Sequence, residues 1–187
     1  MKTALVLIDI QNDYFPGGKM ELEGSLEASE CAKRLLSFFR ERNLPLVHIQ
    51  HVATKPTATF FLPDTDGVKT HENVKPLEDE TLFQKHYPNS FRDTPLLDHL
   101  KRGQIERVVI VGMMTHMCID ATTRAAFDFG FQCLIAQDAC ATRALTHDGK
   151  TVPADHVHRA FLAALNGTYG KVLTTDTIIQ QLQSLGK

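Results

Sequence analysis

The 187-residue sequence contains no apolar run that approaches the ~20 residues a bilayer-spanning helix needs. Its 20 basic and 22 acidic residues leave a formal net charge of −2, so charge gives no reason to expect a nucleic acid or a membrane as a partner. The first residues, MKTALVLIDIQND, lack a small-residue cleavage site and reach Asp9 after one short apolar run. We therefore expect a first strand there and not a signal peptide.

Patterns that hold metals or disulfides are also absent from the sequence. The four cysteines have no CxxC spacing and no secretory context, so we expect free thiols in a reducing, cytoplasmic compartment. The nine histidines form no HExxH pattern. His48 and His51 are three residues apart on a strand and its exit, which places them on opposite faces. We expect no metal ion and no other cofactor.

Apolar strands and amphipathic helices alternate along the chain. This alternation predicts right-handed crossovers and a parallel sheet covered on both faces. We therefore expect one α/β domain over residues 1–187, a three-layer doubly wound fold whose six-stranded, mostly parallel sheet has the order 3-2-1-4-5-6, with helices on both faces. Strands are predicted over 3–9, 46–50, 81–85, 108–111, 131–138 and 171–175, and helices over 25–42, 95–103, 121–129, 153–166 and 176–185.

Residues 51–80 form the least regular stretch and contain three prolines. A loop of this length in a compact domain is usually functional. Phe60 and Phe61 within it either anchor the loop to the core or form part of a pocket wall, and core anchoring is the favoured interpretation.

Cys118 marks the point where the predicted central strand gives way to a helix. Backbone N–H groups and the positive end of the helix dipole meet there, and both favour a thiolate over a thiol. A cysteine in an intracellular protein is more often a small buried hydrophobe. Open α/β sheets, however, bind their ligands at the carboxyl ends of their central strands, so both interpretations stay open.

Asp9 and Lys85 end the first and third predicted strands. In the expected strand order, Asp9, Lys85 and Cys118 converge at one edge of the sheet. A carboxylate can accept the thiol proton and return it to a leaving group, and an ammonium lowers the pKa of a thiol. Taken singly, Asp9 would more often cap a turn and Lys85 would more often be solvated. Their conjunction with a cysteine predicts nucleophilic catalysis.

Four segments carry a resemblance to a known family, in the order that this family has them. They are LVLIDIQNDYF at 5–15, Lys85 with the following NSFRDT at 85–94, VIVGMMTHMCIDATTRAAFDFGF at 109–131, and AQDACAT at 136–142. Together they span most of the chain. The sequence resembles the isochorismatase-like cysteine hydrolases, which include nicotinamidases, N-carbamoylsarcosine amidases and streptothricin hydrolase-like enzymes.

The resemblance implies a catalytic triad of Asp9, Lys85 and Cys118. Cys118 would attack a carbonyl or similar carbon to give a covalent, thioester-type intermediate, while Asp9 carries the proton. Lys85 would stabilise the thiolate and position Asp9. The resemblance also implies a cis peptide between Met113 and Met114, which would direct the backbone N–H of Met114, with that of Cys118, at the developing oxyanion.

Two departures from the family narrow the implied activity. Metal-dependent nicotinamidases carry an Asp-x-His motif after the second strand, where this chain reads HIQHVAT. True isochorismatases lack the nucleophilic cysteine, which is present here as Cys118. The resemblance therefore favours a metal-free hydrolase of an amide or other C–N bond.

Four residues near the strand ends are candidates for contact with a small-molecule substrate. Gln11 either binds the substrate or fixes its own loop, and Phe15 and Tyr87 are candidate pocket walls. His116 lies two residues before the cysteine, and it meets substrate or another subunit unless it is simply exposed to solvent.

Other functions make demands that the sequence does not meet. Phosphotransfer by Asp9 would need a second aspartate two residues on, where the chain has Gln11. A flavodoxin-like module for a nucleotide or small molecule lacks its GxGxxG or Walker loop after the first strand. This module and a catalytically degenerate family member remain the alternatives to a cofactor-free cysteine hydrolase. By analogy with the family we expect a homo-oligomer, either a dimer or a tetramer.

Overall fold

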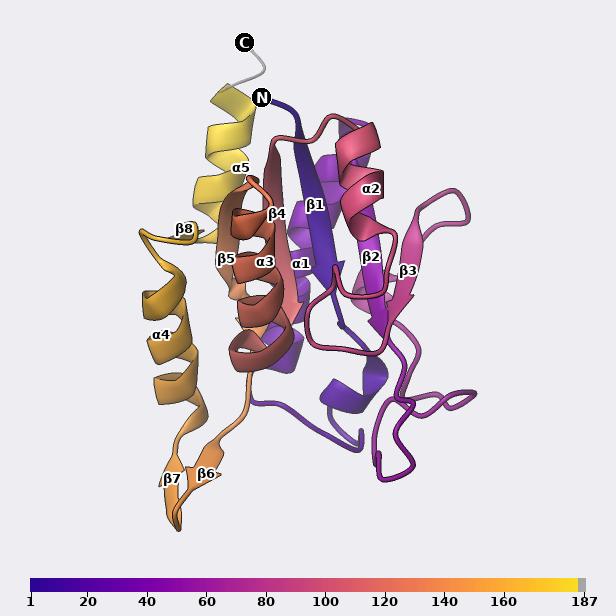
Figure 1. Cartoon of the computed structure of the whole chain (residues 1–187), viewed down its shortest axis with the longest axis vertical. Helices are drawn as coiled ribbons and strands as arrows, with labels where there is room; N and C mark the ends of the chain where they lie inside the picture. Colours follow the sequence, from indigo (N-terminus) through magenta and orange to yellow (C-terminus); the bar gives the residue numbers. More distant parts are fainter. Residues whose placement is uncertain (185–187) are drawn as a thin grey trace.

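A computed structural model describes residues 1–184 of the chain, and its centre is a parallel sheet of six strands in the order β3-β2-β1-β4-β5-β8 (Figure 1). This order is the predicted 3-2-1-4-5-6, because β8 is the last strand of the sheet along the chain. The arrows of β1 to β4 point to the lower edge in Figure 1, where the carboxyl ends of the strands gather. The strands are β1 (Thr3–Ile8), β2 (Leu46–His51), β3 (Leu82–Lys85), β4 (Arg107–Met113), β5 (Gln132–Ala141) and β8 (Lys171–Leu173).

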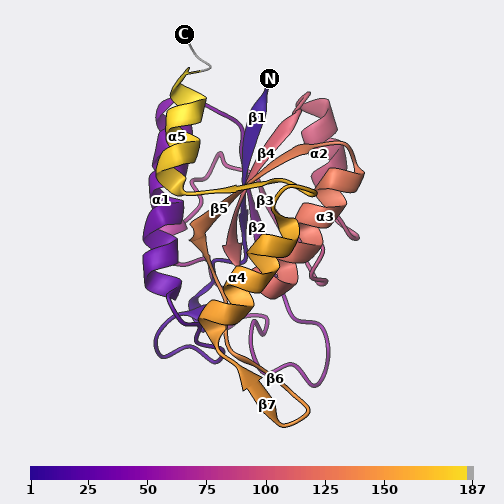
Figure 2. The same cartoon turned by 90° about the vertical axis from the view of Figure 1, so that its left-hand side faces the viewer.

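Helices cover both faces of the sheet, which gives the three layers that the sequence predicts. Figure 2 shows α1 and α5 on one side and α2, α3 and α4 on the other. Each side encloses its own cluster of buried hydrophobic residues. The prediction extends the last helix to residue 185, which lies outside the described residues. The helices are α1 (Ser25–Glu41), α2 (Leu96–Arg102), α3 (Asp120–Asp128), α4 (Ala154–Leu165) and α5 (Thr175–Ser184).

Two features between β4 and α4 differ from the prediction. β5 runs three residues past its predicted end at Asp138, because a register shift opposite β4 lets Cys140 and Ala141 pair with the end of that strand. An antiparallel hairpin of β6 (Leu145–His147) and β7 (Lys150–Val152) then projects from the body of the molecule (Figures 1 and 2). The hairpin was not predicted, because its short strands are mostly exposed and carry no alternating apolar pattern.

The long connection between β2 and β3 is ordered by contacts with the turn that follows β1. Its one helical segment is the short η2 (Glu72–Val74). Backbone bonds join Asn12 N to Lys69 O and Asp13 N to Gly67 O, each at 3.0 Å. This connection therefore packs across the carboxyl edge of the sheet, next to the strand ends where the sequence predicts a site.

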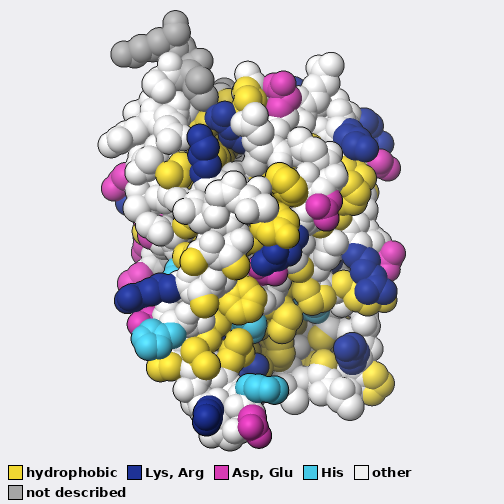
Figure 3. All heavy atoms as spheres, turned by 60° about the vertical axis from the view of Figure 1, so that its left-hand side comes forward, with side chains coloured by type: hydrophobic (Ala, Val, Ile, Leu, Met, Phe, Trp, Pro, Cys, Tyr) yellow, Lys and Arg dark blue, Asp and Glu magenta, His cyan; other side chains and the backbone are white. Residues whose placement is uncertain are grey.

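Hydrophobic side chains gather on the face where α4 and the hairpin lie (Figure 3). Val152 of β7, Phe127 of α3 and Met117, just before α3, are large hydrophobic residues that remain exposed. Among residues 1–184, no helix is long and apolar enough to cross a membrane.

Candidate active site

Three segments that are distant in sequence place Asp9, Lys85 and Cys118 at the carboxyl edge of the sheet. Asp9 follows β1 with a positive φ of 52°, a conformation that Asp adopts more readily than most residues. Lys85 is the last residue of β3. Cys118 lies in η3 (Thr115–Ile119), a single π-helical turn between β4 and α3. Parallel strands bring all three residues to the same edge.

Close approach of β1 and β4 just before the site depends on a glycine. Gly112 has a φ of +126°, and a Cβ built on it would lie 1.9 Å from the carbonyl oxygen of Ile8. No other residue type fits this position without moving one of the two strands. The glycine therefore fixes how Asp9 and the turn at Cys118 face each other.

The ammonium of Lys85 joins the other two groups. Its Nζ lies 2.7 Å from Asp9 Oδ2 and 3.2 Å from Cys118 Sγ. The side chains of Asp9 and Lys85 are 0% exposed, and Cys118 is buried as well. Nζ also donates to the carbonyl oxygens of Tyr87 and Pro88, at 3.1 and 3.4 Å. These contacts hold the end of β3 against the turn at Cys118.

The thiol of Cys118 is protonated in this environment. Burial raises its pKa, the Asp9 carboxylate raises it further, and the opposing effect of Lys85 is smaller. Burial alone would lower the pKa of Lys85, but Asp9 and then Cys118 raise it above its ordinary value. Desolvation and the neighbouring carboxylate thus act against the ammonium, which favours the thiolate as the sequence predicts.

The carboxylate of Asp9 lies close to that thiol. Among residues 1–184, neither carboxylate oxygen receives a hydrogen bond of good geometry, although Oδ2 is ion-paired with Lys85. A buried carboxylate with so few donors lacks the partners that it would have in water. One carboxylate oxygen of Asp9 and Cys118 Sγ belong to a group of atoms that lie within 4.8 Å of one another.

His51, the last residue of β2, is the third member of that group. Burial lowers its pKa to about 4, against a smaller raising effect of Asp9, so the imidazole is neutral at physiological pH. Its Nδ1 lies 3.3 Å from Lys85 Nζ and accepts a hydrogen bond from it, since an ammonium can only donate. His48 lies on the opposite face of the strand, as predicted, and is bonded to Glu80 at 2.9 Å.

A carboxylate, an imidazole and a thiol are donors that suit a transition metal. Here, however, Lys85 Nζ lies 2.7 Å from Asp9, 3.3 Å from His51 and 3.2 Å from Cys118. The ammonium thus takes the central position that a shared cation would need. The residues present fit a protonated amine and do not fit a metal ion.

A cavity of about 380 Å³ opens beside Cys118. A volume of this size suits a small molecule. Its wall comes mainly from the stretch that follows β2, with the turn after β1 and η3 closing it. Among the described residues, those that line it include no carboxylate. They are Tyr14, His51, Ala53, Thr54, Lys55, Thr57, Ala58, Thr59, Phe60, Phe61, His86, Pro88, Met114, Met117 and Cys118.

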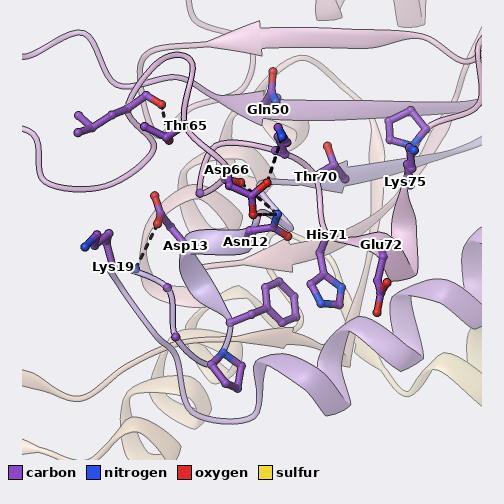
Figure 4. Close-up of a pocket in the computed structure, with 18 of the residues that line it drawn as sticks. Asn12, Asp13, Lys19, Gln50, Thr65, Asp66, Thr70, His71, Glu72 and Lys75 are labelled. Atoms are coloured by element: carbon purple, nitrogen blue, oxygen red, sulfur yellow. Dashed lines mark hydrogen bonds and ion pairs between the residues drawn. The ribbon is translucent and has the colours of Figure 1, made fainter.

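A larger cavity, of about 1060 Å³, lies elsewhere on the β2–β3 connection (Figure 4). Asn12, Asp13 and His71 lie around it, and it is lined by none of Asp9, Lys85 and Cys118. The residues that line it include no cysteine, and those drawn in Figure 4 form no buried ion pair. Size therefore does not mark the reactive site; the buried groups beside the smaller cavity do.

Two of the predicted substrate residues have contacts away from Cys118. Gln11 Nε2 donates to the carbonyl oxygens of His51 and Val68 at 2.9 and 2.8 Å, and its Oε1 accepts from His51 N at 2.8 Å. These bonds fix the loop, which was one of the two roles considered for Gln11. Phe15 stacks on His71 at 3.7 Å between ring centroids and lines the larger cavity.

The other two predicted substrate residues are also absent from the lining of the smaller cavity. The ring of Tyr87 lies 3.6 Å from the guanidinium carbon of Arg92. His116 is half-buried, and its Nδ1 lies 2.6 Å from Thr142 Oγ1. Substrate contact by either residue stays a prediction.

Sequence reasoning missed two residues that line the cavity beside Cys118, Tyr14 and His51, and it favoured a core role for a third, Phe61. Tyr14 lies within the segment that resembles the family, and His51 was considered only as a metal ligand. Phe61 was expected to anchor the loop, and it is both buried and part of the cavity wall. The sequence does place Tyr14 only five residues after Asp9, which was the one available sign that it lies near the site. The direction of its side chain, however, depends on the turn made by η1 (Asn12–Tyr14).

The peptide between Met113 and Met114 is cis, as the resemblance implies. Met114, which directly precedes η3, and Cys118, which lies within it, both line the cavity. A thiol, a carboxylate and an ammonium at the carboxyl edge of a doubly wound sheet, opening on a small cavity, define an α/β protein equipped for thiol and acid–base chemistry.

Comparison with known proteins agrees with this description. Residues 3–177 match the Isochorismatase domain. The isochorismatase family protein YddQ of Bacillus subtilis is 51% identical over 180 residues, which cover 96% of this chain and 100% of that protein. A streptothricin hydrolase of Streptomyces noursei is 31% identical over 160 residues, 84% of this chain and 62% of that enzyme. An isochorismatase hydrolase from Oleispira antarctica has a crystal structure with a TM-score of 0.92 and 50% identity, covering 96% of each chain. The chain belongs to the isochorismatase family of hydrolases.

Proposed function

We propose that this protein hydrolyses an amide or other non-peptide C–N bond of a small molecule through a covalent intermediate on Cys118. The observation that carries the proposal is the buried contact of one ammonium, Lys85 Nζ, with both Asp9 and Cys118. The similarity to a streptothricin hydrolase, and at 26% identity to a maleamate amidohydrolase of Pseudomonas putida, supports C–N hydrolysis.

Asp9 begins the reaction by taking the proton from Cys118. The sulfur then attacks the carbonyl carbon, and the carbonyl oxygen becomes an oxyanion. The backbone N–H groups of Met114 and Cys118 are the proposed donors to this oxygen. As the C–N bond breaks, Asp9 returns the proton to the leaving nitrogen, which departs as ammonia or an amine. A thioester on Cys118 remains.

Water completes the cycle in a second step of the same kind. Asp9 accepts a proton from the water molecule while its oxygen attacks the thioester carbon. The C–S bond breaks, the carboxylic acid leaves, and the sulfur regains a proton from Asp9. Lys85 stabilises the thiolate each time it forms, because its Nζ is a hydrogen-bond donor to Sγ.

A screen of amides, carbamates and N-carbamoyl amines with detection of released ammonia tests the proposal. We expect Cys118→Ala and Asp9→Asn to abolish turnover, and Cys31→Ala, which removes a half-buried thiol on α1, to leave it unchanged. Mass spectrometry of the quenched reaction is expected to show the acyl group on Cys118. Turnover near the wild-type level in Cys118→Ala would exclude the mechanism.

We further propose that the protein forms a homo-oligomer and works in the cytoplasm. The hydrophobic side chains that gather on the face in Figure 3 support an interface there, and Met117, Phe127 and Val152 are exposed large hydrophobic residues. The free state of all four cysteines supports a reducing compartment. Analytical ultracentrifugation of the wild type and a Phe127→Asp variant tests the first point, and a monomeric wild type contradicts it.

A further inference from the structure

We propose that the hydroxyl of Tyr14 donates a hydrogen bond to the substrate and thereby selects molecules with an acceptor at that position. This inference rests on the proposed function, because it assigns a further residue to the same site. It starts from a polar group in the cavity beside Cys118 that has no partner within the protein.

Tyr14 is held rigidly. Its backbone N donates to Gln11 O, and its carbonyl oxygen accepts from Leu22 N, both at 3.0 Å. Its ring packs against Phe61 and Phe60, with centroids 4.6 and 6.0 Å apart. The residue is only 2% exposed. Packing thus fixes where the hydroxyl lies, so little side-chain entropy is lost when a ligand binds to it.

The hydroxyl itself has no hydrogen-bond partner among residues 1–184. The fully enclosed polar atoms that lack a partner belong to Asp9, Arg107 and Thr123, so the Tyr14 oxygen keeps contact with the cavity that this residue lines. A phenylalanine would give the same packing, so the hydroxyl adds only a polar group that is open to the cavity and has no partner in the protein. The hydroxyl therefore has a use that packing does not provide.

The surroundings make this hydroxyl a donor. Burial raises the pKa of Tyr14 well above its ordinary value, and the nearby Cys118 and Asp9 raise it further. The proton stays on the oxygen at physiological pH, and the cavity wall includes no carboxylate among the described residues to compete for it. A carbonyl, carboxylate or aromatic nitrogen of the substrate is the acceptor that fits.

Tyr14→Phe is the test, with Tyr169→Phe as the matched control, because Tyr169 packs against Phe127 and Arg124 outside the cavity. On an amide that the wild type hydrolyses, we expect Tyr14→Phe to lower kcat/KM roughly 10–100-fold. The preference over an analogue that lacks the acceptor should shrink by the same factor. Unchanged melting temperature would show that packing is intact. A kcat/KM within twofold of the wild type would overturn the proposal.

A second measurement keeps this test independent of the proposed hydrolysis. Iodoacetamide brings an amide carbonyl to Cys118, whereas iodoethane alkylates a thiol by the same displacement and carries no hydrogen-bond acceptor oxygen. If the wild type hydrolyses no amide, the proposed function fails, and the labelling rates of Cys118 decide on Tyr14 alone. We expect Tyr14→Phe to slow the labelling of Cys118 by iodoacetamide about fivefold relative to its labelling by iodoethane. Equal effects on both reagents would overturn the proposal.

Discussion

The ion pair of Asp9 and Lys85 allows the stability of the site to be separated from its chemistry. Both side chains are 0% exposed, and their charged atoms are 2.7 Å apart. Removing one partner leaves the other charge buried, which costs about 3–5 kcal/mol of unfolding free energy. In a protein of this size that lowers the melting temperature by roughly 6–20 °C. Asp9→Asn and Lys85→Met are therefore both expected to be strongly destabilised.

The double variant Asp9→Asn/Lys85→Met is expected to be more stable than either single variant. It removes both charges together, and replacing a whole buried pair typically costs little. Urea denaturation with an unchanged m-value measures the three free energies. All three variants are expected to lack turnover. The double variant regains stability, but it still lacks the Asp9 carboxylate that accepts the thiol proton.

The exposed pair of Asp66 and Lys69 is the matched control. Its atoms are 3.1 Å apart, but the side chains are 79% and 68% exposed. The corresponding substitutions there are expected to change stability by no more than about 0.5 kcal/mol. Additive losses in the Asp9 and Lys85 variants, with the double variant the least stable, would refute the argument that buried charge sets the cost.

Three further outcomes are expected. Burial raises the pKa of Cys118 most, and the Asp9 carboxylate raises it further. Asp9→Asn removes that second effect, so labelling of Cys118 by iodoacetamide at pH 7 should become faster although turnover is lost. Slower labelling would contradict this effect of Asp9. Glu80 has its pKa lowered to about 2, since its bonds to Arg40, Leu77 and His48 outweigh burial. The ionised Glu80 therefore contributes about 2–3 kcal/mol to the free energy of unfolding above pH 4.5, and this contribution is lost as the pH falls toward 2. In acid denaturation, Glu80→Gln should not show this loss of stability. Gly112→Ala should unfold the protein or cost at least about 4 kcal/mol, whereas Gly149→Ala, at a φ of +71° with open space around it, should cost about 1 kcal/mol by thermal denaturation.

The sequence alone predicted the architecture and the meeting of Asp9, Lys85 and Cys118 at one edge of the sheet, which the structure confirms. Apolar strands that end on Asp9 and Lys85 are local patterns, and the strand order was taken from the common doubly wound arrangement. Once the order is known, residues at strand ends must meet at one edge, so the convergence with Cys118 follows from topology. The same reasoning placed His48 and His51 on opposite faces, because side chains alternate along a strand.

Only the tertiary structure decided the cavity wall and the protonation of the site. The side chains of Gln11 and Phe15, which follow β1, point where the β2–β3 connection packs on them. Tyr14 and Phe61 reach the cavity because of the same packing. The Cys118 thiol keeps its proton because burial and Asp9 act across space. Desolvation and non-local charge depend on which distant segments exclude water from a group, and no local pattern of residues carries that information.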